Sequence, residues 1–301
     1  MYLTVNAFGK LRLEHDGYVV SAFPTRQVEE LFAFLLVNPQ TEHSREKIIN
    51  LLWPELPASS GRGRLSTVLW RLRTLFQQLA IPVEDYLQAT RDWIAFVPTQ
   101  PLNLDLLLFR SHLAAAATAT SDTELERALE RAIDIYRGDL FEGLYADWCL
   151  NEREYLARQH LRAMGQLMAC LMRQKRHDEA LALGTEILHR DPLREEVHRA
   201  MMHCYWQNGQ FAQAARQFQD CTQLLLREMQ ISPMPETVIL YSTIMEDRLN
   251  YARLQSSMPT AVQRQLQLAF AEFQQVVVRF NRMLDQLGEV SLETTQHEKS
   301  L

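Results

Sequence analysis

The chain has 301 residues with a formal net charge of −6 at pH 7, and 47% of its residues are hydrophobic. This apolar content is enough to build buried cores, which excludes disorder as the general state. No apolar run reaches the roughly 18 residues that cross a bilayer, and the first residues lack the order of a signal peptide. We therefore expect a cytoplasmic protein with no membrane partner.

Cysteine and motif content argue against a metalloprotein or an enzyme. The chain has four cysteines: Cys149, Cys170, Cys204 and Cys221. They show no CxxC pairing and lie in helix-like segments, which is typical of reduced, buried thiols. His198 and His203 lie near Cys204, but this cluster does not favour a metal site. No Walker A, GxSxG, HExxH or dinucleotide glycine pattern occurs, so we expect no catalytic residues, no metal and no cofactor.

The first hundred residues predict strands followed by helices. Period-two alternation, interrupted by Gly9 and by the HDG turn at residues 15–17, predicts short strands within residues 2–8, 10–14 and 18–23. Apolar residues at helical spacing then predict a helix over residues 25–38. A second helix should begin at the N-cap Ser44 and end at the Trp53-Pro54 pair. Its expected buried residues are Ile48, Ile49, Leu51 and Leu52.

Positive charge is concentrated on a third expected helix, SSGRGRLSTVLWRLRTLFQQL, at residues 59–79. Residues 1–100 carry ten basic and ten acidic residues, so the whole deficit of six lies in residues 101–301. No acidic residue occurs between Glu55 and Glu84. A chain that is acidic overall can therefore still present one basic face to an anionic polymer.

The third helix divides into an apolar face and a polar face. At about 100° per residue, an arc of about 120° holds Leu65, Val68, Leu69, Leu72, Leu75, Phe76 and Leu79. The polar arc has Arg62 and Arg73 along one margin and Arg64 and Arg71 along the other, with Ser66, Thr67, Trp70 and Thr74 between them. A helix in a major groove needs cations near the two phosphate backbones and hydrogen-bonding side chains near the base edges. We also expect Gly61 and Gly63 to let backbone amides approach a phosphate.

A hairpin is expected after the third helix. Residues 87–98, LQATRDWIAFVP, predict two short strands around a turn at residues 90–92. Such a wing would place Arg91 against an adjacent minor groove. Arginines on one isolated helix are more often a solvated face, so the prediction depends on the hairpin and the two arginine margins together. They predict a winged helix over residues 1–99 that binds double-stranded DNA.

Helical segments follow the junction at Pro98 and Pro101, where the strand signals end. They cover residues 105–119, 122–138 and a long run over 147–173. Residues 169–188 and 203–222 superimpose at an offset of 34, which is the length of a tetratricopeptide repeat (TPR). Ala180 and Ala214 occupy matching positions at which two helices approach closely.

A TPR-like domain is therefore expected over residues 102–250, and the fold class is mainly α with an N-terminal α+β winged helix. Residues 124–138 have the pattern of the second helix of an earlier, degenerate repeat. The groove of such an array binds a protein or a ligand, or the helices only hold the molecule together. The sequence leaves this choice open, and the identity of any small-molecule effector stays unknown.

The order of these segments resembles a known family. The stretches FPTRQVEELFAFLLVNP and REKIINLLWPELP precede the arginine-rich helix. The stretches IYRGDLFEGLYADWCLNEREYL and DPLREEVHRAMMHCYWQNGQFAQAARQF follow in the helical part. Over roughly residues 1–250 the chain looks like the antibiotic-regulatory-protein (SARP-like) type of bacterial transcriptional activator, whose second half is the bacterial transcriptional activator domain.

The resemblance implies an OmpR-type winged helix that binds direct repeats in promoters, usually as a dimer. It also implies contacts with the sigma factor and other subunits of RNA polymerase. By this resemblance, the helix at residues 62–76 would enter the major groove and the Arg91 hairpin would be the wing. The operator, the target genes, and activation as against repression at a given promoter are not specified by it.

A C-terminal amphipathic helix is expected over residues 259–290. Its apolar residues alternate in steps of four and three: Leu266, Phe270, Phe273, Val277, Phe280, Leu284 and Leu287. This narrow seam is typical of a coiled coil that would form a homodimer, although phenylalanine at three seam positions also suits a helix that docks on its own repeat domain. Both interpretations remain open.

A second function is compatible with the same pattern. A helical-repeat scaffold or signalling adaptor whose winged helix contacts protein instead of DNA would share the fold and the exposed arginines. Salt dependence separates the two interpretations, because only phosphate contacts release condensed counterions.

Overall fold

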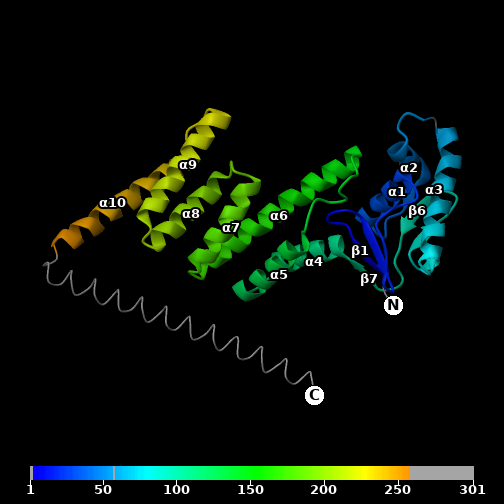
Figure 1. Ribbon diagram of the computed structural model, residues 1–301, viewed down its shortest axis with the longest axis horizontal. Helices are drawn as coiled ribbons and strands as arrows, with labels where there is room; N and C mark the ends of the chain where they lie inside the picture. The colour runs from blue at the N-terminus through cyan, green and yellow to red at the C-terminus, as the bar shows by residue number, and fades with distance from the viewer. Residues whose placement is uncertain (1–2, 57, 258–301) are drawn as a thin grey trace, which may run out of the picture.

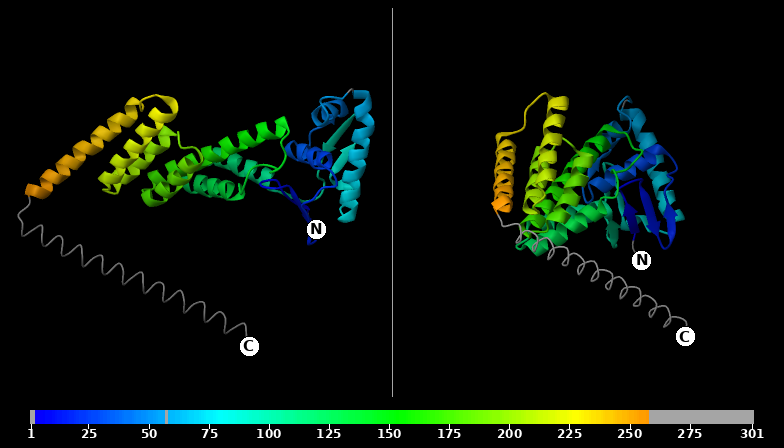
Figure 2. Two further views of the ribbon diagram at one scale, coloured as in Figure 1. Left: turned by 45° about the horizontal axis from the view of Figure 1, so that its top comes forward. Right: turned by 60° about the vertical axis from the view of Figure 1, so that its left-hand side comes forward.

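The structure is a computed structural model that describes residues 3–56 and 58–257. Over these residues the molecule is elongated, with the strands and first three helices at one end and the remaining helices extending away from them (Figures 1 and 2). The expected fold class, mainly α with a small N-terminal β region, is confirmed. In the described part of the chain, none of the helices combines the length and apolar character that spanning a bilayer requires.

The N-terminal sheet contains the three predicted strands and a fourth that was not predicted. β1 (Leu3–Asn6), β2 (Arg12–His15) and β3 (Tyr18–Val20) pair antiparallel. β7 (Leu102–Leu104) adds to β1 in parallel, with Leu3 opposite Leu102. β7 could not be predicted from the sequence, because a strand of three residues directly after a proline shows no period-two pattern. Since β7 lies beyond residue 99, the proposed division between residues 99 and 102 cuts the sheet; it stays a prediction.

The predicted helices and hairpin of the winged helix are confirmed. α1 (Arg26–Val37), α2 (Arg45–Leu52) and α3 (Ala58–Gln78) lead through a 3-10 turn, η1 (Val83–Asp85), into β5 (Leu87–Ala89) and β6 (Trp93–Phe96). The short β4 (His43–Ser44) joins this second sheet in the antiparallel order β4-β6-β5. Ser44 is the N-cap of α2, and its hydroxyl accepts from the Lys47 N–H at 3.2 Å. Of the four side chains expected to be buried on α2, Leu51 is only half-buried.

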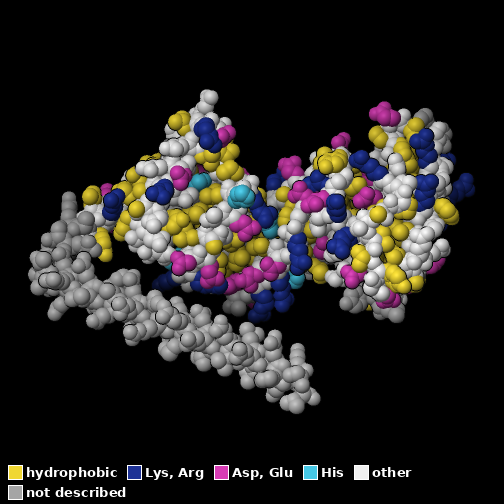
Figure 3. Space-filling model, viewed as in Figure 1, with side chains coloured by type: hydrophobic (Ala, Val, Ile, Leu, Met, Phe, Trp, Pro, Cys, Tyr) yellow, Lys and Arg dark blue, Asp and Glu magenta, His cyan; other side chains and the backbone are white. Residues whose placement is uncertain are grey.

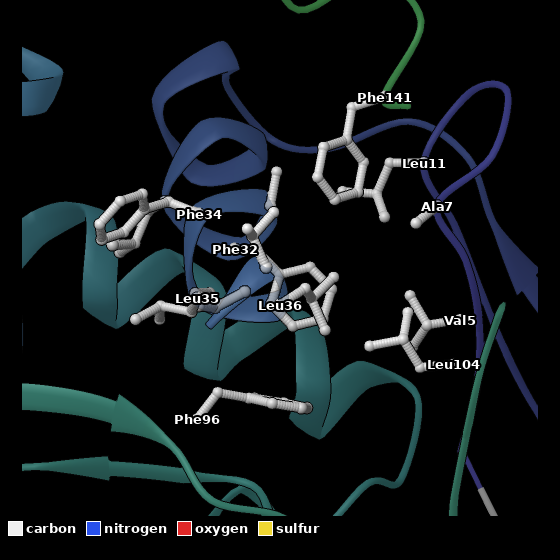
Figure 4. Packing of buried hydrophobic residues seen from close by; sticks show 14 of the residues in the cluster. Val5, Ala7, Leu11, Phe32, Phe34, Leu35, Leu36, Phe96, Leu104 and Phe141 are labelled. Carbon is white, nitrogen blue, oxygen red and sulfur yellow. The ribbon is translucent and has the colours of Figure 1, made fainter. Parts of the chain in front are cut away.

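The winged-helix core surrounds α1, whose residues from Leu31 to Val37 are all buried. The Phe32 ring meets Phe76 of α3 and Phe96 of β6 edge-on, with centroids 5.6 and 5.8 Å apart. Figure 4 shows the α1 side chains between Phe96 on one side and the strand residues Val5 and Leu104 on the other. α1 therefore fixes the position of α3 relative to the sheets.

Between residue 105 and residue 257, where the description ends, seven helices form the repeat part. They are α4 (Asp105–Ala117), α5 (Asp122–Ile135), α6 (Asp147–Arg173), α7 (His177–Arg190), α8 (Glu195–Gln207), α9 (Phe211–Met229) and α10 (Pro235–Ser257). Each helix packs on the next, including α5 on α6, although a longer segment separates these two in sequence (Figure 1). Ala180 and Ala214 are fully buried, as their matching positions predicted. Gly184 was not singled out from the sequence, although a Cβ there would lie 2.8 Å from Cγ of Met201.

Side chains from the repeat helices also complete the winged-helix core. Arg110 of α4 donates to the carbonyl oxygen of Val37 at the end of α1 and pairs with Glu152 of α6, both at 2.7 Å. Trp148 of α6 meets the ring of Phe34 edge-on, with centroids 5.4 Å apart. The first buried cluster accordingly runs without interruption from β1 to Leu156 of α6. The winged helix thus shares one core with the first helices of the repeat part, while the later helices form two further clusters.

The four cysteines are buried and free, as predicted. Burial raises the pKa of Cys204 and of Cys221 to about 11. The Nε2–H of His198 donates to the Pro192 carbonyl at 3.0 Å, and its Nδ1 accepts from the Gln217 amide nitrogen at 2.6 Å. Among the described residues, no group of three or more His, Cys, Asp and Glu side chains is arranged to hold a metal ion. The seam residues Leu266, Phe270, Phe273, Val277, Phe280, Leu284 and Leu287 lie outside the described residues.

Candidate nucleic-acid interface

The apolar face of α3 is held against the core along its whole length. All seven side chains of the predicted 120° arc, from Leu65 to Leu79, are at most 6% exposed. Because a rigid apolar stripe fixes the rotation of a helix about its axis, the opposite face must point to solvent. The periodicity of the sequence was sufficient to predict this orientation.

Four arginines lie on the outward face of α3. Arg62, Arg64 and Arg73 are exposed, and Arg71 is half-buried. Within the described part of the chain, no carboxylate pairs with any of these four guanidinium groups, nor does any side chain or carbonyl accept a hydrogen bond from them. Some arginines of the repeat part are paired instead, since Arg173 and Arg176 are held in ion pairs with Asp122 and Glu126. Figure 3 shows the dark-blue side chains along the outer edge of the molecule over α3.

The short polar side chains of α3 bond to their own helix. The hydroxyls of Ser66, Thr67 and Thr74 donate to the carbonyl oxygens four residues earlier, at 3.0, 3.1 and 3.0 Å. Ser66 and Thr67 are exposed, whereas Thr74 is half-buried. Each of these hydroxyl oxygens keeps lone pairs that can accept a further hydrogen bond. Trp70 is 64% exposed at the centre of the same face.

The expectation for the two glycines is wrong. α3 begins at Ala58, so the N–H groups of Gly61 and Gly63 are not those of the first turn. A Cβ at Gly61 would lie 2.2 Å from Cγ2 of Ile49, whereas one at Gly63 would meet nothing within 4 Å. Gly61 therefore serves the close packing of α3 on α2 instead of an approach to phosphate.

The wing lies beside α3 and is fastened to α2. Thr90 closes the turn, because its hydroxyl accepts from the N–H groups of Asp92 and Trp93 at 3.3 and 3.2 Å. The Arg45 side chain donates to the Thr90 carbonyl at 2.9 Å, and the Arg45 N–H donates to the Asp92 carbonyl at 3.0 Å. Arg91, at the tip, is exposed.

A cleft of about 740 Å³ opens between α2, α3 and the wing. Arg45, Arg62 and Arg91 line it together with Ser66, and the carboxylates in its lining are Glu46 and Asp92. The structure thus brings two predicted cations, Arg62 and Arg91, to one place although they are far apart in sequence. Apart from Arg62 and Ser66, the predicted site residues of α3 do not line this cleft. Arg45 was not predicted as a site residue. Its position at the start of α2, directly after the N-cap Ser44, was the one sequence feature that could have indicated it.

Comparison with known proteins gives a family match over the repeat part of the chain. The family model described as "Bacterial transcriptional activator domain" matches residues 104–245. The chain is 26% identical over 247 residues to the regulatory protein AfsR of Streptomyces coelicolor, covering 81% of this chain and 24% of that protein. It is 25% identical to AfsR of Streptomyces griseus over 254 residues, covering 83% and 25%. The chain spans about a quarter of the length of these curated relatives.

A solved structure shares the fold over most of the chain. Mycobacterium tuberculosis EmbR, in complex with a low-affinity phosphopeptide, superimposes with a TM-score of 0.69 at 19% identity, covering 91% of this chain and 70% of that one. The expected resemblance to SARP-like activators is confirmed by these matches. The chain therefore carries a bacterial transcriptional activator domain at residues 104–245 and, over most of its length, is similar to SARP-like regulators of transcription.

Proposed function

We propose that the chain binds double-stranded promoter DNA sequence-specifically, with α3 in the major groove and the Arg91 wing at an adjacent minor groove, and that it activates transcription. One observation carries this proposal. The apolar face of α3 is buried, while its four arginines and Arg91 have no protein partner within the described residues. Unpaired guanidinium groups on a rigidly oriented helix are suited to phosphate and to the O6 and N7 atoms of guanine.

The wing supports the proposal through its attachment. Because Arg45 ties the Thr90 carbonyl to the start of α2, the wing and α3 keep a fixed spacing before any ligand arrives. Arg62 and Arg91 face one cleft with the half-buried Arg45 behind them. A phosphate between α3 and the wing would meet cations from three elements, and such preorganisation lowers the entropy lost on binding.

Salt dependence tests the phosphate contacts. If the five guanidinium groups Arg62, Arg64, Arg71, Arg73 and Arg91 each neutralise one phosphate, log K should fall against log salt with a slope of about −4.5 per chain. That slope is a loss of about 500-fold between 50 and 200 mM salt. We expect the double variant Arg71→Ala/Arg73→Ala to make this slope less steep by about 2 on every DNA sequence. Arg127 is exposed on α5, and Arg127→Ala should leave the slope unchanged. A response that is flat with salt contradicts the proposal.

Base recognition requires a separate test. We expect Arg64→Ala or Arg73→Ala to weaken binding equally on cognate and random duplexes, because phosphate contacts carry no sequence information. Thr67→Ala and Trp70→Ala should instead change which base pairs are preferred, which selection from a randomised duplex pool would measure. If all four variants lose the same affinity on cognate and random duplexes, the placement of α3 in the major groove is contradicted. Footprinting on the DNA that flanks the gene would identify the operator.

Partners beyond DNA are proposed on similarity alone. We infer contacts with RNA polymerase, including its sigma factor, and a homodimer on repeated half-sites. Promoter-dependent transcription with purified polymerase tests the first, since a chain that binds DNA without raising transcript yield contradicts activation. Sedimentation of the full chain against residues 1–257 tests whether the segment from Leu266 to Leu287 is responsible for a dimer.

Trp70 favours one alternative. A tryptophan that is 64% exposed in the middle of a polar face is the kind of side chain that anchors protein interfaces. A protein-interaction scaffold or adaptor would bury Trp70 against a partner and would bind duplex DNA weakly and with little sequence preference. Retained DNA selectivity in Trp70→Ala together with lost capture of a protein partner would favour this alternative.

A further inference from the structure

A second cationic cleft lies outside the proposed DNA-binding surface. It has a volume of about 560 Å³ and opens between the N-terminal sheet and the α4–α5 hairpin. Its walls come from β1, β2 and β7 on one side and from α4, α5 and the segment after α5 on the other. A volume of this size is in the range that holds small organic ligands.

Three cations surround the cleft: Lys10, Arg12 and Arg137. All three are exposed, and no carboxylate of the described residues forms an ion pair with any of them. Arg137 makes one long hydrogen bond from Nε to the Asp134 carbonyl, at 3.4 Å, which leaves its terminal nitrogens available. In Figure 3 dark-blue side chains are visible over the central part of the molecule, where the strands meet α4 and α5.

The single carboxylate in the lining, Asp105, is already committed. Its oxygens accept from the backbone N–H groups of Ala7, Phe8 and Leu106 at 2.7 to 3.1 Å. Burial raises the pKa of Asp105, while these hydrogen bonds and the positive charge of Arg137 lower it. Asp105 carries at most one negative charge against the three cations of the lining. The cleft therefore keeps an excess of positive charge.

The cleft also has an apolar wall. Leu108 of α4 is 41% exposed, and Ile135 at the end of α5 is half-buried; both line the cleft. Asn6 and Asn103, on the paired strands β1 and β7, add side-chain amides to the opposite wall. Cations at the rim, amides on one wall and apolar side chains on the other suit a ligand with an anionic group and an apolar body.

The wall formed by residues 7–10 is preorganised. The Gly9 N–H donates to the Asp139 carbonyl, and the N–H groups of Phe141 and Glu142 donate to the carbonyls of Ala7 and Gly9, all at 2.8 Å. Gly9 has a φ of +90°, a conformation that glycine adopts without strain. Since Asp105 holds the same segment from the other side, the cleft needs no rearrangement to accept a ligand.

We propose that this cleft binds a small organic anion, a phosphate ester or carboxylate with an apolar body. Such a ligand would contact Lys10 and Arg12 from the winged helix and Arg137 and Leu108 from the repeat part at the same time. It would therefore fasten the two parts together at the junction, as an effector site distinct from the surface of α3. The proposal is independent of DNA binding.

Isothermal titration calorimetry on the full chain without DNA tests the site. The probes are phenyl phosphate and benzoate, with inorganic phosphate and phenol as the anion-only and apolar-only comparisons. We expect saturable binding of phenyl phosphate or benzoate with one site per chain, and weaker binding of both comparison probes. Absence of saturable binding by both phenyl phosphate and benzoate, or equal affinity for phenol, would overturn the proposal.

Variants of the arginines that line the cleft test where the probe binds. Arg12→Gln and Arg137→Gln each remove one charge-assisted hydrogen-bonding group and should weaken the bound probe about tenfold or more. Arg131→Gln is the matched control, because Arg131 is exposed on α5 but does not line this cleft. Circular dichroism at the titration temperature verifies that each variant is folded. Unchanged affinity in both Arg12→Gln and Arg137→Gln, or an equal loss in Arg131→Gln, would place the probe elsewhere and refute the assignment.

Discussion

Two glycines in the same helix should respond oppositely to the same substitution. Replacing glycine by alanine inside a helix normally stabilises it by about 1 kcal/mol, because alanine loses less backbone entropy on folding. Gly63 follows this rule, since an added Cβ meets nothing within 4 Å. We therefore expect Gly63→Ala to raise the free energy of unfolding by about 0.5 to 1 kcal/mol.

At Gly61 the added methyl group would lie 2.2 Å from Cγ2 of Ile49 and 3.3 Å from its Cβ. Ile49 is fully buried, and Cγ2 is attached directly to Cβ, so no far end of a side chain can swing away. Overpacking of this kind costs about 1 to 3 kcal/mol, which outweighs the helical gain of about 1 kcal/mol. We expect Gly61→Ala to lower the free energy of unfolding by up to about 2 kcal/mol.

Urea unfolding followed by circular dichroism measures both variants. Ile49→Ala supplies the third comparison, because it removes the clashing methyl group at the expense of a cavity. The double variant Gly61→Ala/Ile49→Ala should then be less destabilised than the sum of the two single variants. The reasoning about the α2–α3 contact is refuted if Gly61→Ala is as stabilising as Gly63→Ala.

Three further expectations concern the core, the junction and the C-terminal segment. His160 is buried and stacked on Tyr136, and burial lowers its pKa from 6.5 to about 4. Because the unfolded chain takes up the proton at a higher pH than the folded chain, the free energy of unfolding is highest above pH 6.5. It should fall by up to about 3 kcal/mol as the pH drops toward 4. Urea unfolding over that pH range should show a smaller fall for His160→Phe than for the unchanged chain. Residues 1–99 alone lack β7 and Arg110, so we expect no cooperative thermal unfolding from them, and a sharp transition would contradict the shared core. Residues 1–257 should sediment as a monomer if the coiled-coil interpretation of the seam is right, and an unchanged dimer would place the interface elsewhere.

Local periodicity predicted the elements whose sequence repeats over several turns. The seven buried side chains of α3 and the caps of α2 could be predicted because one burial stripe or one capping residue decides them. The three-residue strand β7 could not, since it has too few residues for a period and its pairing with β1 spans about a hundred residues.

The site was predicted in its composition but not in its geometry. The arginines on α3 and Arg91 were recognised by charge, yet the meeting of Arg62 and Arg91 in one cleft depends on Arg45 reaching the Thr90 carbonyl. The hydroxyls of Ser66 and Thr67 were expected to meet bases, and the structure shows their protons directed at their own helix. Gly61 was assigned to phosphate because a glycine near a helix N-terminus suits that role, and its close contact with Ile49 is visible only in three dimensions.

The parallel pairing of β7 with β1 has a consequence for building hybrid regulators. A chimera joined in the proline-containing linker would separate β1 from its own partner strand and oblige a foreign segment to replace it in register. A crossover placed beyond Leu156, where the first buried cluster ends, would transfer the winged-helix part together with the helices that pack against it. Exchange of the proposed DNA specificity between relatives should therefore succeed more often with the longer graft than with the shorter one.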